Sequence, residues 1–128
     1  MLIGVGSPFP PITRDSSRFK VDQTNNSYIF PGVGLGALAV GASDGMFMAA
    51  AKALASSSPA RDNSKHNLLP PVSGLREVAV TVALAVALQA HKDGLVTDVP
   101  TDQIEQRIRA KVWRPRYVPY RRASGSRT

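Results

Sequence analysis

The 128-residue chain contains no cysteine. This absence excludes a disulfide framework and thiolate chemistry, and it is consistent with a reducing compartment. The apolar segment Met1–Gly6 is too short for the hydrophobic part of a signal peptide, and no basic segment precedes it. We therefore expect a cytoplasmic protein.

Long apolar runs are also scarce. The longest is the eleven-residue stretch Val78–Leu88, in which only Thr81 is polar. A helix that spans a membrane needs about 20 predominantly apolar residues. This run therefore predicts a buried helix of a globular domain, and we expect no membrane partner.

Acidic residues are missing from the C-terminal part of the chain. Residues 107–128 hold eight of the 16 basic residues and no acidic one, whereas the remainder holds eight basic and nine acidic residues. Some basic tails bind nucleic acid or acidic partners, but more of them are solvated extensions or subunit-packing arms, and we favour that interpretation. Trp113, Tyr117 and Tyr120 alternate with prolines here and form no recognisable nucleic-acid-binding module.

The first third of the chain has the pattern of two strands followed by a helix. The apolar run Leu2–Val5 stops at a glycine and predicts a buried parallel strand, and the alternating segment Arg18–Gln23 predicts a second strand that ends near Thr24. Prolines between them predict an extended loop. A helix is then expected from Pro31 to Gly41, because proline is tolerated in the first turn of a helix.

Three more helices are predicted downstream. The first covers Gly45–Ser56 and is capped by Asp44, with apolar residues Phe47, Ala50, Ala51 and Leu54 at helical spacing. After a polar loop, a second helix is capped by Ser73 and ended by Gly94. A last helix opens at Pro100–Thr101, and its inner stripe is Ile104, Ile108 and Val112.

Asn25 and Asn26 are the first candidate binding residues. Neighbouring asparagines are usually turn residues, but these two follow a predicted strand, and ligands of open α/β sheets bind beyond the carboxyl ends of strands. An asparagine amide both donates and accepts hydrogen bonds, so it can hold a carboxylate, a hydroxyl or a carboxamide.

The segment Gly32–Ala37 formally matches the dinucleotide fingerprint G-x-G-x-x-A. The match is weak, because Pro31 precedes it and no acidic residue follows about 20 residues later. We favour the interpretation that its small residues let one helix pack closely on another. Neither His66 nor His91 has partners at metal-ligand spacing, so we expect no metal site in this chain.

Longer motifs carry a specific resemblance. The stretch Val21–Gly36 reads VDQTNNSYIFPGVGLG and contains the pattern N-N-x-Y/F-x-F-P-G-x-x-L-G. It resembles the C-terminal part of the cofactor-binding domain of NAD(P)-dependent malic enzymes. Four further runs resemble this family in the same order: LIGVGSPF, MFMAAAKALA, LLPPVSGLREV and WRPRYVPYRR.

The resemblance implies an α/β fold, namely the C-terminal part of a Rossmann-like doubly wound domain with few strands, about four helices and a basic tail. Residues 1–113 would form this part of the domain, and residues 114–128 the tail. Because so few strands cannot complete a doubly wound sheet, we expect the chain to be a fragment whose partners include the remainder of the enzyme. The resemblance implies that the full enzyme is a homo-oligomer.

The resemblance also implies site roles. Asn25 and Asn26 would contact malate and the nicotinamide end of the cofactor, and Gly6 and Ser7 would line the cofactor cleft. The full enzyme would convert malate to pyruvate and CO₂ with NAD or NADP and with Mg²⁺ or Mn²⁺. Its base, its acid and its metal ligands lie outside this chain, so the chain alone is expected to be inactive. The alternative is a non-catalytic helical module whose basic tail binds nucleic acid or an acidic partner.

Overall fold

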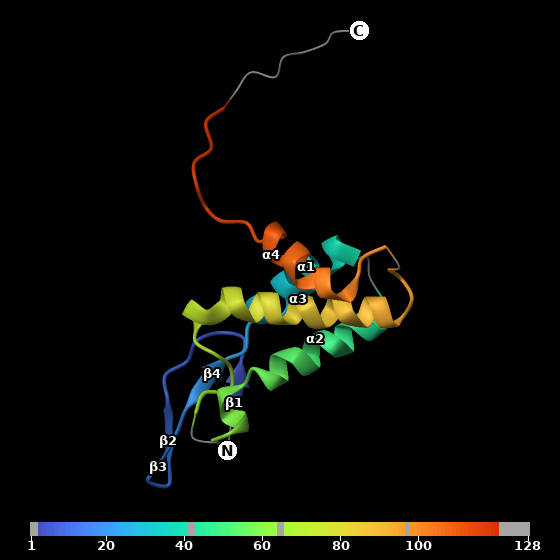
Figure 1. Cartoon of the computed structure of the whole chain (residues 1–128). Coiled ribbons are helices and arrows are strands. Elements are labelled where there is room, and N and C mark those ends of the chain that lie inside the picture. Colours follow the sequence, from blue (N-terminus) through green and yellow to red (C-terminus); the bar gives the residue numbers. More distant parts are fainter. Residues whose placement is uncertain (1–2, 41–42, 64–65, 97, 121–128) are drawn as a thin grey trace.

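The computed structural model describes residues 3–40, 43–63, 66–96 and 98–120. Figure 1 shows the strands gathered at one end of a group of helices, with residues 112–120 leading away from the helices. The strands are β1 (Ile3–Val5), β2 (Ile12–Arg14), β3 (Ser17–Phe19) and β4 (Val21–Gln23). The α-helices are α1 (Phe30–Val40), α2 (Asp44–Ser56), α3 (Leu75–Lys92) and α4 (Thr101–Lys111). Three short 3-10 turns are η1 (Asn26–Tyr28), η2 (Pro59–Arg61) and η3 (Val72–Gly74).

The strands form two separate pairs. β1 lies parallel to β4, with Ile3 opposite Val21 and Val5 opposite Gln23. The backbone N–H of Thr24 extends this pairing by donating to the Val5 carbonyl at 2.7 Å. The predicted first strand is confirmed over Ile3–Val5, while Leu2 lies outside the described residues.

The prediction of one strand over Arg18–Gln23 is wrong. The segment forms two strands because the chain changes its partner at Lys20: Phe19 pairs antiparallel with Ile12, whereas Val21 pairs parallel with Ile3. β2 was not expected. Its hairpin turn is Asp15-Ser16, whose φ angles of 47° and 61° are those of a tight hairpin turn. Such turns usually contain glycine, and this one has none.

α3 is the central helix, in contact with α1, α2 and α4 (Figure 1). One of its faces joins a buried cluster made of Met46, Ala50, Val78, Val82, Val86 and Ala90. Another face joins a second cluster made of Val80, Ala83, Ala87, Val99, Ile104 and Ile108. Within the described residues, Val72–Lys92 is long and apolar enough to cross a membrane by length and composition alone. Its place in both clusters confirms the prediction of a buried core helix.

α1 packs against α3 through glycines. A methyl group at Gly32 would lie 2.5 Å from the Val82 Cβ, and one at Gly36 would lie 2.6 Å from the Val86 Cγ1. The absence of side chains at these two positions therefore allows the helix backbones to approach closely. This confirms that the glycine motif of α1 serves helix packing.

Two predicted helix caps are wrong. Ser43 occupies the cap position of α2, and Asp44 is the first residue of the helix. Gly74 occupies the cap position of α3, because Ser73 belongs to the preceding turn η3. Gly94, with φ of 73°, follows the end of α3 as predicted. Phe47 is 55% exposed, because the buried side of α2 is formed by Met46 and Ala50.

α4 matches its prediction. Ile104 and Ile108 are buried, and Val112 packs against their cluster from just beyond the helix. Residues 112–120 have no regular secondary structure, and Tyr117 and Tyr120 are fully exposed. The division into a domain part over residues 1–113 and a tail over residues 114–128 stays a prediction.

Asp93 joins the start of α2 to the end of α3. Its Oδ2 accepts a hydrogen bond of 3.0 Å from the Ser43 hydroxyl, and its Oδ1 accepts one of 2.7 Å from the Gln89 amide. We expect Asp93→Ala to lower the free energy of unfolding by about 1–2 kcal/mol in urea titrations, because both bonds are lost. Among the described residues Asp62 makes only an exposed ion pair with Arg61, so Asp62→Ala should change the free energy of unfolding by less than about 0.5 kcal/mol. Equal effects of the two substitutions would contradict the bridging role of Asp93.

Candidate functional site

The candidate site lies at the carboxyl ends of β1 and β4. Because these strands are parallel and adjacent, the residues that follow them meet at one edge of the sheet. Gly6 and Ser7 follow β1, and Asn25 and Asn26 follow β4 after Thr24. The structure therefore brings together at this edge the segments that carry all four site residues predicted from the sequence.

The two asparagines have different surroundings. The Asn25 side chain caps η1: its Oδ1 accepts a 2.9 Å hydrogen bond from the Ser27 backbone N–H. Its Nδ2 donates to the Gly6 carbonyl at 3.5 Å. Asn26 is exposed, and its side chain makes no hydrogen bond to any other residue that the structure describes. The amide of Asn26 is therefore available to an external ligand, while that of Asn25 holds the local backbone.

Gly4 in β1 and Gly6 in the turn after it also have different surroundings. A methyl group at Gly4 would lie 2.7 Å from the Thr24 Cγ2, so a larger residue there would force the Thr24 side chain to shift. A methyl group at Gly6 would meet nothing within 4 Å. Gly6 thus leaves open space beside Asn25, into which a ligand can approach the backbone.

Gln23 also reaches this edge, although it was not among the site residues predicted from the sequence. It is the last residue of β4, and its Nε2 lies 3.4 Å from the Gly6 carbonyl oxygen. Residues two apart in an extended chain point to the same side, and Gln23 and Asn25 have this spacing. That alternation is the signal that could have identified Gln23.

Polar contacts hold the edge against the loop before η3. Asp22, only 8% exposed, accepts a hydrogen bond from the Leu68 backbone N–H, and Lys20 donates one to the side chain of Asn67. The buried Tyr28 donates its hydroxyl to the Pro70 carbonyl at 2.8 Å. These contacts place η1, and with it the two asparagines, relative to the rest of the chain.

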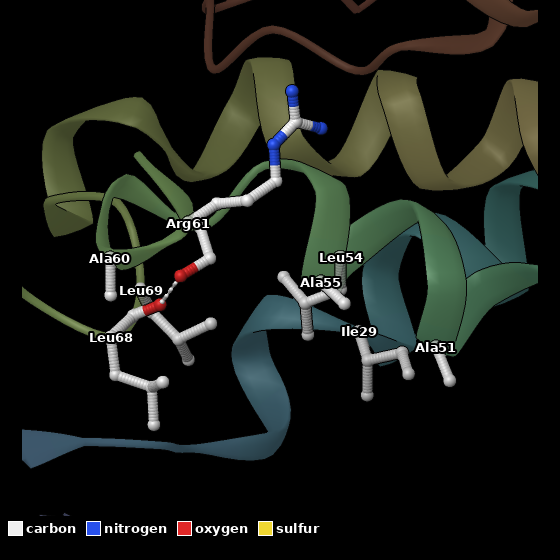
Figure 2. Close-up of a pocket in the computed structure, with 9 residues that line it drawn as sticks. Ile29, Ala51, Leu54, Ala55, Ala60, Arg61, Leu68 and Leu69 are labelled. Atoms are coloured by element: carbon white, nitrogen blue, oxygen red, sulfur yellow. Dashed lines mark hydrogen bonds between the residues drawn. The ribbon is translucent and has the colours of Figure 1, made fainter. Parts of the chain in front are cut away.

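A separate apolar pocket of about 520 Å³ lies between α2 and the loop that carries Leu68 and Leu69. Figure 2 shows its labelled side chains, which are apolar except for Arg61, whose guanidinium points away from the others. None of the predicted site residues lines this pocket. Its lining has no acid or base aimed inward, so it offers a surface for packing and no reactive group.

The charged side chains that the structure describes form no second candidate site. Among the residues that the structure describes, no three His, Cys, Asp or Glu side chains come close enough to hold a metal ion. A hydrogen bond to Glu105 raises the pKa of the Arg109 guanidinium. Arg109 also pairs with Glu77 and so links α4 to α3, away from the candidate site.

Known proteins match this chain along most of its length. The family model described as "Malic enzyme, NAD binding domain" matches residues 1–91. The NAD-dependent malic enzyme of Psychrobacter arcticus is 45% identical over 126 residues, which are 96% of this chain and 22% of that protein. The proteins of the same name from Pseudomonas aeruginosa and Pectobacterium carotovorum are 43% and 41% identical over 126 residues, again with 96% and 22% covered. The chain thus spans about 22% of the length of these relatives.

Proposed function

Since the chain belongs to the family of the malic enzyme NAD-binding domain, as its motifs predicted, we propose that it forms one wall of the active site of an NAD-dependent malic enzyme. The complete protein would oxidise malate and release pyruvate and CO₂, with NAD as the electron acceptor. The observation that carries the proposal is the meeting of Gly6 and Asn25 at the carboxyl edge of β1 and β4, with the exposed amide of Asn26 next in the chain.

The residues at this edge fit a polar ligand. Asn26 can donate to and accept from a carboxylate, a hydroxyl or a carboxamide without adding charge, which suits malate and the nicotinamide amide. Asn25 orders the turn that presents Asn26, and the open space beside Gly6 admits the cofactor. When bound, NAD supplies the hydride acceptor, and the contribution of this chain is to bind and orient.

The acid–base and metal chemistry would come from the remainder of the protein. No cluster of metal ligands occurs among the described residues, so we propose that carboxylates outside this chain bind Mg²⁺ or Mn²⁺. A cytoplasmic location, assembly with the remainder of the enzyme and a homo-oligomeric state belong to the same proposal.

We expect the 128-residue chain alone to form no NADH from malate in the presence of Mn²⁺. The proposed reason is that the base, acid and metal ligands of the reaction belong to the remainder of the enzyme. In contrast, a chimera should form NADH if the chain replaces the 126 matching residues of the Psychrobacter arcticus enzyme, to which it is 45% identical. NADH absorbance with malate and Mn²⁺ measures both, with the unmodified relative as the positive control. A chimera that unfolds at the same temperature as the relative but does not turn over would refute the proposed function.

A further inference from the structure

The Gly6 carbonyl is approached by two side-chain amides from one neighbouring segment. The Gln23 Nε2 lies 3.4 Å and the Asn25 Nδ2 lies 3.5 Å from this oxygen. A carbonyl oxygen has two lone pairs and can accept from both donors. Gln23 is the last residue of β4 and is half-buried, and its amide reaches the turn that follows β1.

This contact begins where the backbone pairing ends. The register of β1 and β4 stops at Val5 and Gln23, and the Thr24 N–H makes the last bond, to the Val5 carbonyl. A methyl group at Gly6 would meet nothing within 4 Å, so neighbouring atoms do not enclose this side of the residue. Beyond Val5, the hydrogen bonds to this turn among the described residues come from the side-chain amides of Gln23 and Asn25, at 3.4 and 3.5 Å.

From this geometry we propose that Gln23 is a positioning residue of the NAD site. It holds the Gly6–Ser7 turn beside Asn25, so that this wall of the cofactor site is formed before NAD binds. The inference rests on the proposed function, because it assigns a role within that site. Gln23 acts through the Gly6 backbone and not on the reacting atoms, so its loss should weaken cofactor binding and leave the chemical step intact.

The test compares variants of the chimera with the Psychrobacter arcticus enzyme. Gln23→Met keeps the length of the side chain but removes the donor, and we expect the KM for NAD to rise about three- to tenfold with kcat within about twofold. Gln23→Glu, which puts a carboxylate oxygen against the Gly6 carbonyl, should raise the KM at least as much. Gln103→Met changes an exposed residue of α4 in the same way and should leave both constants unchanged.

The kinetic results distinguish a failure of the proposed function from a failure of the role of Gln23. An unmodified chimera that fails to oxidise malate counts against the proposed function. An active chimera whose Gln23→Met variant keeps its KM for NAD overturns the role of Gln23 alone.

A second measurement does not depend on turnover. In the 128-residue chain, Gln23→Met should shift the carbonyl carbon resonance of Gly6 in NMR spectra, whereas Gln103→Met should not. An unchanged Gly6 resonance would overturn the contact on which the inference rests.

Discussion

Replacing Asn26 with alanine is expected to lower kcat/KM for malate oxidation roughly ten- to a hundredfold in the chimera with the Psychrobacter arcticus enzyme. The proposed cause is the loss of one amide that binds a charged or strongly polar group of substrate or cofactor. A hydrogen bond to a charged group is worth roughly 1.5–3 kcal/mol, which corresponds to this range. The melting temperature should not change, since Asn26 is exposed and supports no other described side chain. Steady-state kinetics and thermal unfolding of the same samples test both statements.

Asn25→Ala provides the contrast. It should lower kcat/KM as well, but it should also reduce stability by about 1 kcal/mol, because it removes the cap of η1 and the bond to Gly6. Asn25→Asp keeps the capping oxygen but replaces the donor to Gly6 with a carboxylate oxygen, so it should recover only part of the stability. Asn63→Ala, in the exposed loop after η2, should leave the kinetics unchanged. If Asn26→Ala and Asn25→Ala both retain normal kinetics, the two asparagines are turn residues and no part of the site.

Replacing Gly32 or Gly36 with alanine is expected to destabilise the fold by about 1–3 kcal/mol, although alanine favours helix formation. At Gly32 the new methyl group would lie 2.5 Å from the Val82 Cβ and 2.8 Å from the Ala79 carbonyl oxygen. At Gly36 it would lie 2.6 Å from the Val86 Cγ1 and 3.1 Å from the Ala83 carbonyl oxygen. Because backbone atoms are among these neighbours, α1 must move away from α3.

Gly34→Ala is the matched control on the same helix. A methyl group there meets nothing within 4 Å, so the substitution should stabilise the protein by about 0.5–1 kcal/mol through helix propensity. Urea unfolding of the three variants measures the contrast. The same sign of change at all three positions would contradict the close α1–α3 packing.

The apolar pattern was sufficient to predict most of the helical layer. Ile104 and Ile108 lie four residues apart, and this spacing alone places them on one face of a helix. The long apolar run around Val82 likewise required a buried helix, because so few of its positions are polar. The side of α2 that is buried could not be predicted, since apolar residues surround that helix. Contacts with α3 select Met46 and Ala50 and leave Phe47 exposed.

The strands depended more on tertiary contacts. Phe19 and Val21 belong to one alternating segment, yet they pair with different partners in opposite directions. Strand pairing joins residues distant in the chain, and a local pattern does not contain that information. The hairpin turn at Asp15-Ser16 was also not predicted, because it lacks the glycine that usually identifies a two-residue hairpin.

Motifs and helical periodicity are local properties, so they were enough to predict the family of the chain, its helices and the candidate asparagines. Which groups meet depends on tertiary contacts. The parallel pairing of β1 and β4 puts the turn at Gly6 next to Asn25, and it places Gln23 within reach of the same carbonyl. The difference between Asn25 and Asn26 also comes from the tertiary structure. The Asn25 side chain caps η1, whereas the Asn26 side chain is exposed. Neighbouring identical residues acquire different roles because the backbone directs their side chains to different surroundings.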